Sequence, residues 1–163
     1  MKLYNLLPRP NDHLEEKANA VLSHFNFKTP NEVDLSMICW HYGIKIVSSN
    51  GMSFSVPTKN RRGVIYLQKG LRFTERRVIC AEEFSHLYLH FSSQINNHYR
   101  NVGKVESQAK RMAAYLLMPQ YLLEKFEFGS FFEQEALVAE VADYFRVTEE
   151  FAYYRLEMLS PTV

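Results

Sequence analysis

Apolar positions near the N-terminus follow helical spacing in two stretches. The first runs from Asn11 to Phe27, and either Asn11 or Asp12 can serve as its N-cap. Thr29-Pro30-Asn31 then interrupts the pattern. The second helical stretch covers Glu32 to Tyr42, with Gly43 placed as a C-cap. The pattern therefore predicts two short helices at the start of the chain.

The next part of the chain changes to extended spacing rich in β-branched residues. Three short strands are predicted, at Ile44–Val47, Phe54–Val56 and Val64–Leu67. Ser49-Asn50-Gly51 and the basic run Lys59–Gly63 form the turns between them. Because these strands are few and close together, we expect one small antiparallel sheet with helices on one side.

From Thr74 onwards the pattern is helical almost to the end. Thr74 is expected to cap a helix over Glu75–Phe91, and a polar loop is expected over Ser92–Gly103. The further helices predicted are Lys104–Met118, ending at Pro119, then Glu133–Phe145 and Thr148–Leu159. The fold class is thus a mostly helical α+β arrangement. We expect residues 1–128 to form the main domain and residues 129–163 a helix-turn-helix-like pair packed on it, as one compact unit.

Composition narrows the class of protein. The 163 residues are 47% hydrophobic, which is enough for a core without disulfides or a structural metal. Nineteen basic against eighteen acidic residues give a net charge of +1, which argues against a protein built mainly to bind nucleic acid or anionic membranes. The two cysteines, Cys39 and Cys80, do not form a CxxC pair, and we expect reduced thiols.

Targeting segments are not expected. Nothing in the chain approaches the roughly 18 consecutive apolar residues that cross a bilayer. The apolar run near Met1 is too short for a secretory signal and is followed by prolines and acids. The sequence therefore predicts a soluble, cytoplasmic protein.

The chemically informative stretch is AEEFSHLYLH, residues 81–90. At about 100° per residue, four of its polar side chains fall within an arc of about 100° on the helix circumference. They are Glu82, Glu83, His86 and His90. Their neighbours are apolar or aromatic, so this helix should be largely buried with one polar stripe facing a cleft. Burying carboxylates and imidazoles without partners is costly, and a metal ion is one economical solution.

A zinc site normally takes a third protein ligand from another element and leaves a position for water. Glu106 is the best donor, because it opens the next helix, whose face continues through Ala109 and Ala113. The two alanines allow close packing against the helix of His86. Glu83, beside the first ligand but turned away from it, is then placed to act as a general base.

These segments together resemble a known family. TERRVICAEEFSHLYLH (74–90) and ESQAKRMAAYLLMP (106–119) resemble the "AHELGHxLLH" and "ExxAxxFAxxLLMP" motifs of the ImmA/IrrE metallopeptidases, the DUF955 domain. The C-terminal stretch from Val141 to Leu156 is similar to the family's "FxVSxxAxxxRL" pair, and Asp34–Ile44 to its N-terminal helix-to-strand element. The likeness covers nearly the whole chain and implies a zincin-like fold.

One position departs from the family's HExxH motif, because Glu82 stands where the first histidine is expected. Three alternatives follow. Glu82 itself is a ligand, giving a set with His86 and Glu106, since carboxylates are acceptable zinc ligands. Alternatively, His90 supplies the missing imidazole from one turn further along. In the third alternative the metal is lost and the protein is a pseudoenzyme that still binds its partner.

The resemblance implies a function that composition does not. Members of the family are zinc-dependent endopeptidases that inactivate helix-turn-helix (Xre-like) repressors, often in prophages, mobile elements or stress responses. The expected cofactor is zinc, or another divalent metal such as manganese, with Glu83 as the catalytic base. The alternative function is a non-proteolytic antirepressor. Direct DNA binding is not expected, because the helix after Thr148 begins with Glu149 and Glu150, whose charge opposes contact with phosphates.

Overall fold

The computed structural model describes residues 12–59, 62–90, 102–127 and 134–159. Within it the chain divides into two compact units. The central unit is Asp34–Ala113, and the terminal unit combines Met1–Val33 with Ala114–Val163. The expected boundary near residue 128 lies beside residues 128–133, which are outside the described part, and it stays a prediction.

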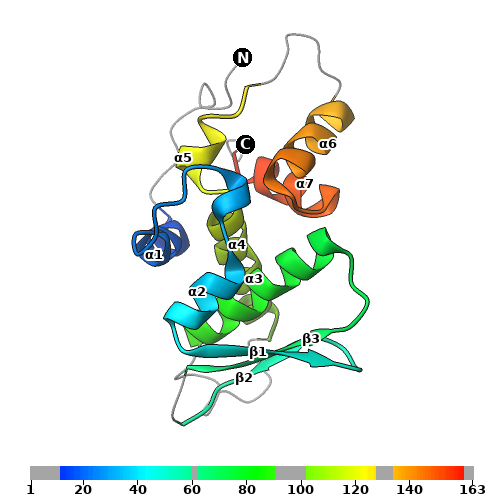
Figure 1. Ribbon diagram of the computed structural model, residues 1–163. Helices are drawn as coiled ribbons and strands as arrows, with labels where there is room; N and C mark the ends of the chain where they lie inside the picture. The colour runs from blue at the N-terminus through cyan, green and yellow to red at the C-terminus, as the bar shows by residue number, and fades with distance from the viewer. Residues whose placement is uncertain (1–11, 60–61, 91–101, 128–133, 160–163) are drawn as a thin grey trace. The chain divides into compact units, whose positions relative to one another are not determined.

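The central unit is a small sheet with helices on one face (Figure 1). Its elements are α2 (Leu35–His41), β1 (Ile44–Ser49), β2 (Phe54–Val56), β3 (Gly63–Gln68), α3 (Phe73–His90) and most of α4 (Val102–Leu117). Alternate residues of β3, namely Gly63, Ile65 and Leu67, are buried. This alternation is the expected pattern of a strand with one face against helices. The mostly helical α+β fold class predicted from the sequence is confirmed.

The sheet is mixed, and the expectation of a purely antiparallel sheet was wrong in this respect. The strand order is β1-β3-β2, with β3 in the centre. β2 pairs antiparallel with β3, with Ser55 opposite Ile65. β1 pairs parallel with β3, with Ile46 opposite Ile65. The prediction assumed that strands adjacent in sequence are neighbours in space, whereas the most buried strand, β3, takes the central position between the other two.

Local sequence signals explain how the elements of the central unit begin and end. Asp34 caps α2, because its Oδ1 accepts from the backbone N–H of Ser36 at 2.8 Å. Gly43 follows α2 with a φ of 70°, a left-handed conformation that glycine adopts without strain. Thr74 is not an N-cap as predicted, since α3 already begins at Phe73. The carboxylate of Glu75 instead accepts from the N–H of Arg72 at 3.3 Å.

α2 and α3 meet in the core of the central unit. Cys39 and Cys80 are buried there as free thiols, as expected. A hydrogen bond with Cys80, together with burial, raises the pKa of the Cys39 thiol. The Cys39 thiol is therefore held protonated, and both buried cysteines act as small apolar side chains.

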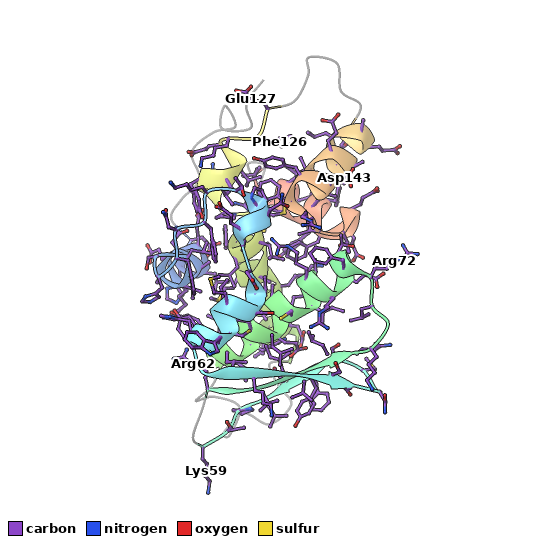
Figure 2. The ribbon with its side chains drawn as sticks, viewed as in Figure 1. Lys59, Arg62, Arg72, Phe126, Glu127 and Asp143 are labelled. Carbon is purple, nitrogen blue, oxygen red and sulfur yellow. The ribbon has the colours of Figure 1, made fainter. Side chains whose placement is uncertain are left out.

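The elements that the structure describes in the terminal unit are helices. They are α1 (His13–Leu22), the 3-10 turn η2 (Pro30–Glu32), the end of α4, α5 (Gln120–Leu123), α6 (Gln134–Phe145) and α7 (Glu149–Glu157). Asp12 is the N-cap of α1, because its Oδ1 accepts from the N–H of Leu14 at 2.9 Å. α5 has no counterpart in the prediction, since Pro119 indicated only the end of the preceding helix. Phe126, labelled in Figure 2, packs its ring 5.1 Å from that of Tyr144 on α6.

A buried arginine links three segments of the terminal unit. Arg155 of α7 is fully buried, and its Nε donates to the carbonyl of Met118 at 3.0 Å. Its guanidinium lies 4.9 Å from the centre of the Tyr115 ring. The Tyr115 hydroxyl in turn donates to the Asp12 carboxylate at 2.6 Å. The cation is thus stabilised by a carbonyl, an aromatic face and, through the tyrosine, a carboxylate.

α6 and α7 form the predicted C-terminal helical pair. Arg146, in the turn between them, has a φ of 56°, which is uncommon for a residue with a side chain. Thr148 caps α7 as predicted, because its Oγ1 accepts from the N–H of Phe151 at 3.2 Å. In the described part of the chain, no helix combines the length and apolar character needed to span a membrane.

Gly63→Ala is expected to destabilise the protein. A Cβ at this position would lie 2.7 Å from both a methyl carbon of Leu87 and the backbone oxygen of Val56. We expect the free energy of unfolding to fall by about 1–3 kcal/mol, measured by urea denaturation. Gly103→Ala in α4 is the control, because a Cβ there meets nothing within 4 Å. Equal stability of the two variants would contradict the close packing of β3 on α3.

Arg155→Ala is expected to lower the free energy of unfolding by about 2–4 kcal/mol, because it leaves a cavity and removes the donor to Met118. The matched control is Arg146→Ala, whose side chain is exposed and contacts Asn31 at 3.4 Å. The control should change stability by less than about 0.5 kcal/mol. A similar effect of both substitutions in thermal denaturation would refute the role assigned to the buried guanidinium.

Candidate functional site

The predicted polar stripe lies on the part of α3 that packs in the central unit. Glu82 and Glu83 are half-buried, and His86 is buried, with 8% of its surface exposed. The flanking side chains that hold this stretch of helix in the interior are Ala81, Phe84, Ser85 and Leu87. The Ser85 hydroxyl donates to the carbonyl of Ala81 at 2.8 Å, so it is satisfied within the helix. The rotation of α3 is therefore fixed by packing.

The central feature of the site is a contact between two helices. Nε2 of His86 on α3 lies 3.2 Å from Oε2 of Glu106 on α4, a hydrogen-bond distance. The His86 side chain is 10% exposed, whereas the Glu106 side chain is 64% exposed. One member of the pair is therefore buried and the other faces the solvent. A ligand that contacts Glu106 would also lie beside the His86 imidazole. On the Glu106 helix, Ala109 and Ala113 are fully buried.

Glu82 lies in the electrostatic field of this pair. Burial raises the pKa of the Glu82 carboxyl above its ordinary value, while Lys110 lowers it. Smaller effects come from Glu83 and Glu106, which raise this pKa, and from His86, which lowers it. Glu83, Glu106, His86 and Lys110 thus all act electrostatically on the Glu82 carboxyl. Three acidic side chains in one neighbourhood create a negative charge that a cation would offset.

The donor types fit a divalent metal, but the positions of the side chains do not complete a site. Histidine nitrogen and carboxylate oxygen are ordinary zinc ligands. Among the side chains that the structure describes, no group of three or more His, Cys, Asp or Glu residues is arranged to hold a metal ion. His86 and Glu106 are brought together, and Glu82 interacts with both. His90 is the last residue of α3, and its side chain lies outside the described part of the structure.

The structure adds an aromatic cluster that sequence reasoning missed. Tyr42 follows α2, and the centre of its ring lies 5.5 Å from the ring centre of Phe84 and 5.6 Å from that of Tyr88. Phe84 and Tyr88 are both on α3. The guanidinium of Arg62 lies 5.1 Å from the Tyr42 ring and 5.2 Å from the Tyr88 ring. Figure 2 shows Arg62 near the end of α2. The sequence placed Arg62 only in a basic turn, and no local signal identified its aromatic partners. The cluster braces the helix that carries His86.

Comparison with known proteins identifies relatives of this chain. The sequence matches the Peptidase_M78 family, described as the IrrE N-terminal-like domain, over residues 39–157. The match includes α3, α4 and the C-terminal pair. The chain is also 26% identical over 151 residues to the phage-like element PBSX protein XkdA of Bacillus subtilis (strain 168). That alignment covers 90% of this chain and 72% of XkdA.

The family match extends over most of the chain and contains both helices that supply the His86–Glu106 pair. The resemblance inferred from the motifs is therefore confirmed, and this chain belongs to the Peptidase_M78 family of metallopeptidases, the ImmA/IrrE family.

Proposed function

We propose that this protein is a metal-dependent endopeptidase that cleaves a helix-turn-helix transcriptional repressor and so relieves repression. The observation that carries the proposal is the contact of His86 with Glu106, which joins the two family motifs in space. The similarity to a protein of a phage-like element favours a prophage or mobile element as the setting. A substrate that binds DNA would place the reaction in the cytoplasm.

Each polar residue has a defined task in this proposal. His86 and Glu106 hold the metal, with Glu82 or His90 as the third ligand. Zinc, or another divalent ion such as manganese, would supply Lewis acidity to a water molecule and to the peptide carbonyl. Glu83 accepts a proton from the attacking water and delivers it to the leaving amine. The buried apolar side chains around His86 exclude bulk water and hold the imidazole in place.

A second candidate function is a non-proteolytic antirepressor, which binds the repressor and displaces it from DNA. One observation favours it. Glu82 stands where the family motif has its first histidine. An antirepressor would act by binding affinity alone. This second function predicts relief of repression that is insensitive to chelators and leaves the repressor intact.

Substitution of Glu83 tests the peptidase directly. The purified protein, loaded with zinc, should cut the helix-turn-helix repressor encoded beside it at a discrete bond, and Glu83→Gln should slow cleavage by at least about 100-fold. The fragments are measured by gel electrophoresis and mass spectrometry. Glu140→Gln, an exposed change on α6, is the control and should cleave normally. An intact repressor under conditions where both proteins bind would refute the peptidase and favour the antirepressor.

Metal analysis separates the two functions without a substrate. For the peptidase we expect about one equivalent of zinc, manganese or another divalent ion per chain, measured by plasma mass spectrometry after dialysis. His86→Ala and Glu106→Ala should each lower this content strongly, because each removes one ligand. His13→Ala, on the exposed side of α1, should retain the full content. Metal content far below one equivalent in the native protein under metal-replete conditions would support the antirepressor.

A further inference from the structure

The C-terminal helical pair is strongly acidic, although the chain as a whole is nearly neutral. Residues 134–159 contain six carboxylate side chains and two arginines, within a chain whose formal net charge is +1. One of the two arginines, Arg155, is fully buried. The surface of this pair therefore presents negative charge, opposite in sign to the helix pairs that bind DNA phosphates.

Three of these six carboxylate side chains line a hollow between α6 and α7. The hollow has a volume of about 500 Å3 and is lined by Gln134, Glu135, Val138, Glu149, Glu150 and Tyr153. We name it the α6–α7 groove. Its three carboxylate residues are exposed, and Tyr153 is 46% exposed. Val138 contributes an apolar side chain to the lining and is 8% exposed.

Helix stability accounts for only part of this arrangement. An acidic residue in the first turn interacts favourably with the helix dipole, and each of α6 and α7 has such residues. The dipole does not require the first turns of two helices to converge on one hollow, nor a half-exposed tyrosine beside them. An aromatic face surrounded by carboxylates matches the side chains of arginine and lysine, because it offers cation–π contact and ion pairing together.

We infer that the α6–α7 groove docks the basic, DNA-reading surface of the helix-turn-helix repressor. The inference rests on the proposed function, which identifies the partner as a repressor. Charge complementarity then indicates which surface of the repressor binds the acidic groove. A repressor presents lysine and arginine where it meets phosphates and base edges. Occupation of that surface by the groove excludes DNA. The groove therefore selects repressor molecules that are off their operator and keeps them off.

The test uses two variants that each remove three negative charges from the same helical pair. The groove variant is Glu135→Gln with Glu149→Gln and Glu150→Gln. The matched control is Glu140→Gln with Asp143→Asn and Glu157→Gln, all exposed and outside the groove. Asp143 is labelled in Figure 2. Both are made in the full chain carrying Glu83→Gln, so that cleavage does not consume the repressor. Circular dichroism and thermal denaturation establish that both are folded.

Binding to the repressor encoded beside this chain is measured by biolayer interferometry at low and high salt. The groove variant should bind at least about 10-fold more weakly at low salt, and the control less than about 3-fold more weakly. Tyr153→Ala should also weaken binding, through loss of its aromatic face. Equal weakening by the groove variant and the control, or no weakening by either, would overturn the inference.

Competition with operator DNA tests which surface of the repressor is docked. A duplex carrying the operator should prevent binding of this chain in proportion to its occupancy of the repressor. A ternary complex of duplex, repressor and this chain would overturn the inference, as would tight salt-sensitive binding of the duplex to this chain alone.

Failure of the inference is distinguishable from failure of the proposed function. Repressor cleavage by a groove variant with Glu83 restored, at a rate equal to that of the native chain and with equal affinity, would remove the docking site and leave the peptidase. Groove-dependent binding without cleavage by the native chain would retain the docking site and remove the peptidase.

Discussion

The site depends on one physical constraint, which is that an imidazole on a packed helix must have a polar partner. Apolar contacts of Phe84 and Leu87 fix the rotation of α3, so His86 is carried into the interior. A buried nitrogen without a hydrogen bond is costly, and Glu106 satisfies it from a second helix. Because the Glu106 side chain is largely exposed, a ligand in the solvent can reach the His86–Glu106 contact.

The charged residues around the His86–Glu106 contact include Glu82, the position that departs from the family motif. Glu82 and Glu83 share the neighbourhood of Glu106, with Lys110 as the cation that counters the effect of burial on the Glu82 pKa. Replacing the usual histidine with Glu82 increases the negative charge next to the proposed metal position. Carboxylate ligands donate charge to a metal and oppose the acidification of water bound to it, so in the proposed peptidase this substitution would bear directly on catalysis.

Charge is also distributed unevenly along the chain. A net charge of +1 gave no indication of the acidic C-terminal pair, because the carboxylates there are balanced by basic residues elsewhere. The pair keeps the helix-turn-helix spacing, with Thr148 as its cap, but its charge is the reverse of that of a DNA reader. In the proposed function the site on α3 would act on a peptide bond, whereas the α6–α7 groove would bind a basic surface.

The sequence by itself determined the helices other than α5, the three strands and the family, because spacing, caps and motif order are local properties of the chain. It also placed His86 and Glu106 in one site, since the two motifs are read together. The tertiary structure decided that β3 lies between β1 and β2, that Arg62 rests on Tyr42 and Tyr88, and that three glutamates surround one hollow. These features depend on contacts between residues distant in sequence, which local spacing does not encode.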